Sequence, residues 1–228
     1  MNDHAINLMS NIEKDTPEHT GHLISFEGSE GSGKTTQIER LEKHLKRLGR
    51  EVIVTREPGG TDIGEQVRHL LKHASAGDKM FPETELLLFA ASRAQLVREV
   101  IAPGLKRGAI IICDRYLDST TVYQGAARNL SEEPLQLINS FAVGEIVPDL
   151  TFVLDIDPEI GLKRVQERGN GKLDRMEREN IEFYRKVRQG YLMLVETLPD
   201  RFCVVEGEQE MNAIEDEIWE EVRRRFGI

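Results

Sequence analysis

The chain has 228 residues, a formal net charge of −10 and a pI near 5.2. This length suffices for one α/β domain with a sizeable core, and the acidic balance argues against nucleic acid or a membrane surface as the main partner. No run approaches the roughly twenty consecutive apolar residues that a membrane-spanning helix needs.

Residues 1–20 are polar and unpatterned, and they lack the basic and apolar segments of a secretory signal peptide. We expect them to be a flexible N-terminal extension, and residues 21–228 to form a single domain in the cytoplasm. The two cysteines, Cys113 and Cys203, agree with this location. Both lie within apolar runs, which favours buried thiols in a reducing compartment over a metal or redox role.

Five short apolar runs predict β-strands. They cover residues 22–26, 52–54, 110–113, 151–154 and 202–205. Near-continuous apolar runs of this length suit strands that are covered on both faces, as in a parallel sheet. Helical patterns lie between and after the strands, at about residues 34–48, 64–72, 83–107, 119–127, 134–143, 158–168, 176–198 and 211–225. This alternation predicts a doubly wound α/β fold, in which a five-stranded parallel sheet is flanked by helices and binds ligands at the carboxyl ends of its strands.

The stretch FEGSEGSGKTT, residues 26–36, joins the first predicted strand to the first helix. It matches the pattern G-x-x-x-x-G-K-[ST] at every fixed position, from Gly28 to Thr35. Glycines let successive backbone N–H groups turn inward around anionic oxygens, and the following helix adds its positive N-terminus. The pattern predicts a nucleotide-binding P-loop, in which Lys34 reaches the β- and γ-phosphates and the Thr35 hydroxyl binds Mg²⁺. The other predicted nucleotide-binding residues are Ser29, Glu30, Gly31, Ser32, Gly33 and Thr36.

Polar clusters follow the next three predicted strands: TREPGGT at residues 55–61, DRY at 114–116 and DIDP at 155–158. Because the carboxyl ends of parallel strands meet at one edge of a sheet, these clusters should converge near the P-loop. Arginine presents a planar fork that suits a phosphate group, so Arg56 and Arg115 suggest a second phosphorylated ligand. Taken singly, each arginine is more often a surface or ion-pair residue. Asp114 is a candidate for holding Mg²⁺ through water, with a helix cap or an ion pair with Arg115 as the alternatives.

These motifs resemble those of bacterial thymidylate kinases. The resemblance runs from about Gly21 to the C-terminus and rests on FEGSEGSGKTT, TREPGGT, LLLFAASRAQL, DRYLDSTTVYQG and ERGNGKLDRME in this order. It implies a P-loop kinase fold with a mobile lid at about residues 164–176, and a homodimer. It also implies Mg²⁺-dependent transfer of the γ-phosphoryl group of ATP to dTMP. Two alternatives remain: a kinase for another nucleoside monophosphate, and a P-loop ATPase or regulatory module without an acceptor.

The resemblance also implies roles at the acceptor site. Phe89 would stack on the thymine ring and Arg93 would hydrogen-bond its edge, although the pattern around Phe89 alone favours a core residue. Arg115 would bind the 5′-phosphate, and Glu30 would bind the 3′-hydroxyl. The remaining acceptor-site residues implied by the motifs are Arg56, Glu57, Thr120, Tyr123 and Gln124. As a bare pattern, Tyr123 is more often ordinary helix packing.

The lid motif could supply a positive charge that the P-loop lacks. Related enzymes with a basic residue after the loop acid use it on the transferring phosphoryl group, whereas this chain has the neutral Gly31. Arg168, Lys172 and Arg175 are therefore predicted to supply the cation when the lid closes, as catalytic residues beside Lys34 and Arg115. The alternative is a solvated charged loop.

Overall fold

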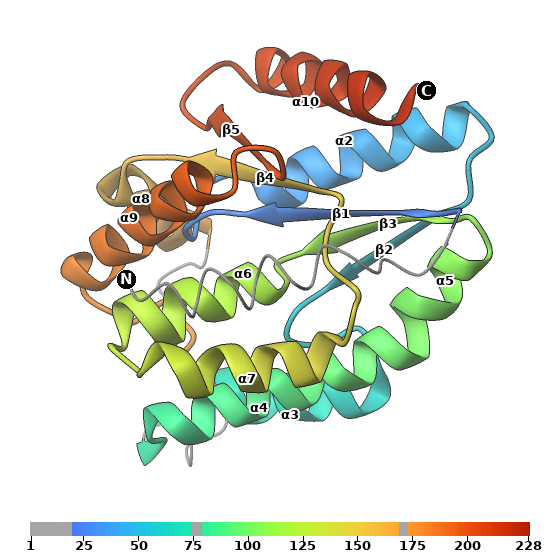
Figure 1. Ribbon diagram of the computed structural model, residues 1–228. Helices are drawn as coiled ribbons and strands as arrows, with labels where there is room; N and C mark the ends of the chain where they lie inside the picture. The colour runs from blue at the N-terminus through green and yellow to red at the C-terminus, as the bar shows by residue number, and fades with distance from the viewer. Residues whose placement is uncertain (1–19, 74–78, 169–172) are drawn as a thin grey trace.

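The computed structural model describes residues 20–73, 79–168 and 173–228. Its sheet has five parallel strands in the order β2-β3-β1-β4-β5. They are β1 (His22–Glu27), β2 (Val52–Arg56), β3 (Ile110–Asp114), β4 (Leu150–Asp155) and β5 (Phe202–Glu206). Each contains one of the apolar runs predicted from the sequence, so the predicted parallel α/β sheet is confirmed (Figure 1).

Helices follow every strand. They are α2 (Lys34–Arg47), α3 (Asp62–Lys72), α4 (Pro82–Leu96), α5 (Ala102–Lys106), α6 (Leu117–Thr120), α7 (Glu132–Val143), α8 (Pro158–Arg168), α9 (Ile181–Thr197) and α10 (Met211–Phe226). Two π-helical turns, η2 (Val97–Ile101) and η3 (Thr121–Ala127), continue α4 and α6. The helix predicted over residues 83–107 is thus α4, η2 and α5 in succession. Among the described residues, no helix is long and apolar enough to cross a membrane.

The sheet separates two apolar layers. On one face, Ile24 and Phe26 of β1 pack with Leu41 of α2 and Ile218 of α10, and Figure 1 shows these two helices together above the sheet. On the opposite face, Leu23 packs with residues of α4, η2 and α5. Because side chains alternate along a strand, Ser25 and Glu27 share the face of Leu23. A buried carboxylate therefore lies at the end of β1, directly before the P-loop.

Candidate active site

The P-loop conformation requires glycine at three positions. Gly28, Gly31 and Gly33 have φ angles of 130°, 76° and 93°, which L side chains rarely adopt. A Cβ at Gly31 would also lie 2.2 Å from the carbonyl oxygen of Gly161, in the first turn of α8. The loop therefore has no room for a basic side chain at Gly31, and a lysine introduced there would displace α8.

Lys34 directs its ammonium group back into this loop. Its Nζ donates to the carbonyl oxygens of Gly28 at 3.1 Å and Ser29 at 2.8 Å, and to Oγ of Ser32 at 3.2 Å. Burial, helped by the nearby Arg115 cation, lowers the pKa of Lys34 to about 8. Phosphate oxygens in the loop would raise this pKa again, because they favour the charged amine. Lys34 and the N-terminus of α2 can thus hold a phosphorylated ligand together.

The two predicted magnesium-binding residues lie in contact. Oγ1 of Thr35, in the first turn of α2, donates to Oδ2 of Asp114 at 3.1 Å. Asp114 ends β3 and is paired in register with Phe26 of β1, which brings it beside the P-loop. Both side chains offer hard oxygen donors, and Thr35 is exposed, so that water and phosphate oxygens could supply further ligands to a bound Mg²⁺. The two residues fit Mg²⁺.

Arg115 lies between the P-loop and η3. Its Nη1 donates to the carbonyl oxygen of Gly28 at 2.9 Å, and its Nη2 lies 3.0 Å from Oε1 of Glu30. The guanidinium carbon is 5.0 Å from the centre of the Tyr123 ring, and the Tyr123 hydroxyl donates to Oε2 of Glu30 at 2.5 Å. Arg115 itself has a φ of 70°, in the left-handed region that non-glycine residues adopt mainly at special sites. Three predicted acceptor-site residues, Glu30, Arg115 and Tyr123, therefore form one cluster.

The charge state of this cluster follows from its contacts. Burial alone would raise the pKa of Glu30, but the Arg115 and Lys34 cations outweigh it, so that the pKa lies below its usual value. Burial would likewise lower the pKa of Arg115, but Glu30 leads the groups that hold it well above its usual value. Glu30 is therefore an ionised acceptor inside the P-loop, neutralised by an arginine that reaches it from the end of β3.

Arg93 is fully engaged within the protein. Its side chain is 1 % exposed. Nε and Nη2 both donate to Oε2 of Glu57, and Nη2 also donates to the carbonyl oxygen of Tyr116. Nη1 donates to Thr120 and Asn139 at 2.9 and 2.6 Å. Arg93 thus joins the segment that follows β2 to α6 and α7. Since all five N–H groups have partners, a bond to a base edge would require sharing one of these donors. The base contact stays a prediction.

Phe89 differs from a core residue. It is only partly buried, and it belongs to none of the apolar clusters formed by the described residues. It lies on α4 one turn before Arg93, and Thr120 and Gln124 lie across from α4 on α6 and η3. Both of these polar residues are 1 % exposed. The structure thus leaves one aromatic surface open beside buried hydrogen-bonding groups, as a base-binding pocket needs.

The two charged residues of the TREPGGT segment, Arg56 and Glu57, both pair with other side chains of the protein. Arg56 is half-exposed, and its Nη2 lies 2.9 Å from Oε1 of Glu65 on α3, so it forms a surface ion pair in this structure. Glu57 is buried and bonds Arg93. Burial raises the pKa of Glu57 to about 7 although Arg93 opposes the shift, and its Oε1 has no hydrogen-bond partner among the described residues. Glu57 therefore contacts the site through Arg93.

The predicted lid cations lie in three different situations. Arg168 is 70 % exposed and pairs loosely with Glu177 at 3.4 Å. Lys172 lies outside the described residues, as does most of the glycine-rich centre of the predicted lid. Arg175 donates from Nε to the carbonyl oxygen of Leu71 at 2.8 Å and from Nη2 to Oε2 of Glu85. These contacts of Arg175 are with α3 and α4, and none of its contacts described here is with the P-loop.

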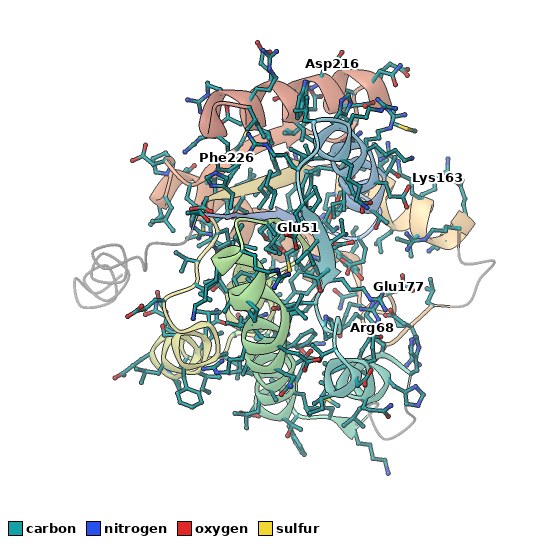
Figure 2. All side chains as sticks on the ribbon, turned by 90° about the vertical axis from the view of Figure 1, so that its right-hand side faces the viewer. Glu51, Arg68, Lys163, Glu177, Asp216 and Phe226 are labelled. Atoms are coloured by element: carbon teal, nitrogen blue, oxygen red, sulfur yellow. The ribbon has the colours of Figure 1, made fainter. Side chains whose placement is uncertain are left out.

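The segment after residue 173 contacts the C-terminal end of α3. The backbone N–H of Arg175 donates to the carbonyl oxygen of Lys72 at 3.2 Å, and Lys72 pairs with Asp174 at 2.8 Å. Figure 2 shows Arg68 of α3 and Glu177 of this segment on the same side of the molecule. A different basic residue meets the P-loop: Nη1 of Arg164, on α8, donates to the carbonyl oxygen of Gly31 at 3.4 Å. The sequence analysis did not single out Arg164 as a site residue.

Glu27 is a further residue that the sequence analysis missed. Its carboxylate is fully buried, and its Oε2 accepts from the hydroxyls of Ser119 at 2.6 Å and Tyr191 at 2.7 Å. Both hydroxyl oxygens in turn lie 3.3 Å from Nη1 of Arg115. Burial, with the neighbouring Asp118 carboxylate, raises the pKa of Glu27, while Arg115 opposes the shift. The sequence signal for Glu27 was an acidic residue at the end of an apolar strand. The residues around Tyr191, on α9, give no comparable signal.

Comparisons with known proteins identify the family of the chain. Residues 26–218 match the family model described as thymidylate kinase. The chain is 49% identical to the thymidylate kinase of Caldanaerobacter subterraneus over 85% of this chain and 91% of that protein. It is 46% identical to the thymidylate kinase of Geobacter sulfurreducens over 90% of this chain and 100% of that protein. The crystal structure of thymidylate kinase from Ehrlichia chaffeensis superposes with a TM-score of 0.71 at 31% identity, covering 89% of this chain and 98% of that one. The chain therefore belongs to the thymidylate kinase family, and its fold is the P-loop kinase fold.

Proposed function

We propose that the edge of the sheet formed by β1, β2 and β3 holds the two substrates of a phosphoryl transfer. The chain transfers the γ-phosphoryl group of ATP to dTMP and gives ADP and dTDP. The observation that carries the assignment of the site is the ion pair between Glu30 of the P-loop and Arg115 at the end of β3. This pair brings a nucleotide cradle and a phosphate-binding arginine to adjacent positions, as in-line transfer between two phosphorylated ligands requires.

The donor side consists of the P-loop and the start of α2. Lys34 and the loop N–H groups, with the helix N-terminus, bind the β- and γ-phosphates of ATP. Thr35 and Asp114 would hold Mg²⁺, which when bound neutralises charge on those phosphate oxygens. The glycines of residues 28–33 carry no Cβ, so the backbone of the loop can approach the phosphates closely.

The acceptor side consists of Arg115 and the groups around it. Arg115 binds the 5′-phosphate of dTMP, exchanging part of its present contact with Glu30 for the ligand. Glu30 is ionised and accepts from the 3′-hydroxyl, while the ring of Tyr123 lies against the sugar and leaves no room for a 2′-hydroxyl. Phe89 stacks on the base, and Gln124 hydrogen-bonds its edge. Arg93, Glu57 and Thr120 support this pocket through their mutual hydrogen bonds.

The transfer itself rests on position and charge. Phosphoryl transfer passes through a loose transition state, so neither a covalent intermediate nor a general base is required of the protein. Lys34 and Arg115 supply two of the cations. Arg168 and Lys172 are the proposed source of the third, because Arg175 is held by Glu85 and Leu71 in this structure. Arg56 is exposed enough to turn toward the acceptor phosphate from its ion pair with Glu65.

We also propose a homodimer, with an interface on α3, α4 and α7. These helices lie together below the sheet in Figure 1, and all three carry apolar side chains that are more than half exposed. The residues are Ile63, Leu87, Leu137 and Phe141. An apolar face of this kind is expected to be covered in solution, and the resemblance to thymidylate kinases favours a second copy of the chain. Phe141→Glu should then halve the mass measured by light scattering, whereas a Met193→Glu control should leave it unchanged.

The two thiols support a cytoplasmic location. Both cysteines are free, and burial raises the pKa of the Cys113 thiol well above its usual range and that of Cys203 to about 11. Neither thiol is therefore activated for redox chemistry or metal binding. Unpaired structural thiols are typical of a reducing compartment, and we place the enzyme in the cytoplasm.

A coupled ADP-release assay tests the function. The enzyme is supplied with ATP and one of dTMP, dUMP, dCMP, AMP or GMP, with Mg²⁺ or with excess EDTA. We expect release that depends on dTMP and on Mg²⁺, a weaker signal with dUMP, and background rates with the purine monophosphates. Equal turnover of AMP or GMP would indicate a kinase for another monophosphate, and release without any acceptor would indicate an ATPase.

A further inference from the structure

Helix α4 makes two polar contacts that lie on either side of Phe89, one with the end of α6 and one with the turn η3. Glu85, Phe89 and Arg93 follow one another at intervals of four residues, so they share one face of α4. Arg93 donates to Oγ1 of Thr120 at 2.9 Å, and Oε1 of Glu85 accepts from Nε2 of Gln124 at 2.8 Å. The half-buried ring proposed to stack on the base is thus bracketed by hydrogen-bonded pairs. Glu85 is the one member of these pairs to which the proposed function assigns no role.

Glu85 is a buried carboxylate surrounded by donors. It is 1 % exposed. Besides Gln124, its oxygens accept from Nε and Nη2 of Arg128, each at 3.2 Å, and from Nη2 of Arg175. Burial alone would raise the pKa of Glu85, but Arg128 leads the partners that outweigh it, so the pKa lies below its usual value. Glu85 is therefore ionised, and an ionised carboxylate can only accept hydrogen bonds.

This carboxylate fixes the orientation of the Gln124 amide. A side-chain amide has a donor end and an acceptor end, which exchange places when it rotates by half a turn. Only the NH₂ end can face Glu85, because the reverse orientation would bring two acceptor oxygens together. The carbonyl Oε1 must then point away from Glu85, and no donor among the described residues reaches it. A buried glutamine is thus held with its acceptor end available.

We propose that Glu85 determines the base specificity of the acceptor site by holding Gln124 in this orientation. The inference rests on the proposed contact between Gln124 and the base. A carbonyl oxygen accepts a hydrogen bond from a pyrimidine whose ring nitrogen N3 carries a hydrogen, as in thymine and uracil. In cytosine N3 is itself a hydrogen-bond acceptor. The Gln124 oxygen and N3 would then face each other as two acceptors with no hydrogen between them, which disfavours binding. Glu85 is a positioning residue that acts through Gln124 and touches no substrate.

Substrate discrimination in Glu85→Gln tests the proposal. The readout is the ratio of kcat/KM for dTMP to that for 5-methyl-dCMP, two substrates that share the sugar and the methyl group. A glutamine at position 85 offers both a donor and an acceptor, so the Gln124 amide can rotate, and we expect the ratio to fall by at least about tenfold. A merely structural role for Glu85 would lower both kcat/KM values together and leave the ratio unchanged.

Two further variants make the experiment specific. Arg128→Gln removes one arginine partner of the same carboxylate without touching Gln124. Because Arg175 still pairs with Glu85 and opposes its protonation, this variant should keep the wild-type ratio. The exchange Glu85→Gln with Gln124→Glu places an ionised carboxylate opposite the base and an amide behind it. It again presents only an acceptor to the base, and it should recover most of the preference for dTMP. This exchange serves as the test if Glu85→Gln alone does not fold, as judged by thermal unfolding.

Gln124→Leu separates this inference from the function on which it rests. If Gln124→Leu lowers the ratio while Glu85→Gln leaves it at the wild-type value, Gln124 reads the base without Glu85 and the proposal is overturned. If Gln124→Leu leaves the ratio unchanged, the assigned role of Gln124 fails, and the role of Glu85 fails with it. Neither result bears on the phosphorylation of dTMP by the wild-type enzyme, which the ADP-release assay tests separately.

Discussion

The phenolic oxygen of Tyr123 lies 2.5 Å from Oε2 of Glu30, whose other oxygen pairs with Arg115 at 3.0 Å. Two segments that are 93 residues apart in the chain are thereby joined at the point where the proposed sugar and 5′-phosphate lie. Since Glu30 is ionised and Tyr123 is its donor, the Tyr123 ring has a fixed position across the pocket. We therefore propose that the Glu30 carboxylate orients the groups that face the acceptor.

Tyr123→Phe separates the two uses of this side chain. The ring remains, so the variant should still reject a 2′-hydroxyl, but the lost hydrogen bond to Glu30 should raise the KM for dTMP by roughly tenfold. Tyr123→Ala should lose both properties. The measurement is kcat/KM for dTMP and for the ribose analogue 5-methyl-UMP. A phenylalanine variant as permissive toward 5-methyl-UMP as the alanine variant would show that the ring does not exclude the hydroxyl.

Lys34 should give ATP binding a characteristic pH dependence. Because its pKa in the free enzyme is about 8, the amine is charged below this pH and loses its proton above it. The KM for ATP should therefore rise above about pH 8, while the KM for dTMP changes little. Steady-state kinetics between pH 7 and 9.5 measure both constants. Lys34→Arg keeps its charge over this range and should give a flat, though slower, profile, and a wild-type profile equally flat would contradict the assignment.

Glu27→Gln tests the support of the acceptor arginine. Glu27 accepts from the hydroxyls of Ser119 and Tyr191, which leaves the oxygens of both facing Nη1 of Arg115. With a neutral amide this arrangement is no longer enforced, and the KM for dTMP should rise by roughly tenfold while that for ATP is maintained. Ser25→Ala, which removes a different bond to the same carboxylate, is the matched control. Equal increases in both KM values would point to general disorder of the loop.

Arg168 and Arg175 should behave differently although both belong to one motif. Arg168 is exposed and loosely paired, so Arg168→Ala should lower kcat by roughly tenfold or more with little change in either KM, the pattern of a transition-state contact. Arg175→Ala removes a partner of buried Glu85, so it should mainly lower the thermal unfolding midpoint and raise the KM for dTMP. Identical effects of the two substitutions on kcat would restore the prediction that both act on the phosphoryl group.

The strands and the P-loop could be predicted because their signals are local. Each apolar run became a strand, and the glycine spacing of residues 28–33 corresponds to backbone angles that only glycine adopts readily. The sequence pattern predicts a helix from residue 176, whereas α9 begins five residues later, at Ile181. The Asp174 carboxylate accepts from the backbone N–H groups of Met176 and Glu177 and holds a turn, and Asn180 caps the helix. Asp174 and Asn180 are both residue types that favour such turns and caps, so the sequence contained the signal for the later start of the helix.

The partners of the site residues could not be predicted in this way. Arg93 meets Asn139, which is 46 residues away, and Glu27 meets Tyr191, which is 164 residues away. No periodicity or motif specifies such pairs, because they arise when helices distant in the chain pack against one another and against the end of a strand. The sequence therefore identified Arg93 and Arg175 as hydrogen-bonding cations, but it did not indicate that they pair with Glu57 and Glu85.

The most direct test of the account is the stoichiometry of the products. Purified enzyme is incubated with ATP, Mg²⁺ and dTMP, and the nucleotides are separated by ion-exchange chromatography. We predict that ADP and dTDP form in equal amounts in the wild type, and that Arg115→Ala loses both products together, since the acceptor phosphate is no longer held in line. Formation of ADP and inorganic phosphate without dTDP, in the wild type, would contradict the account.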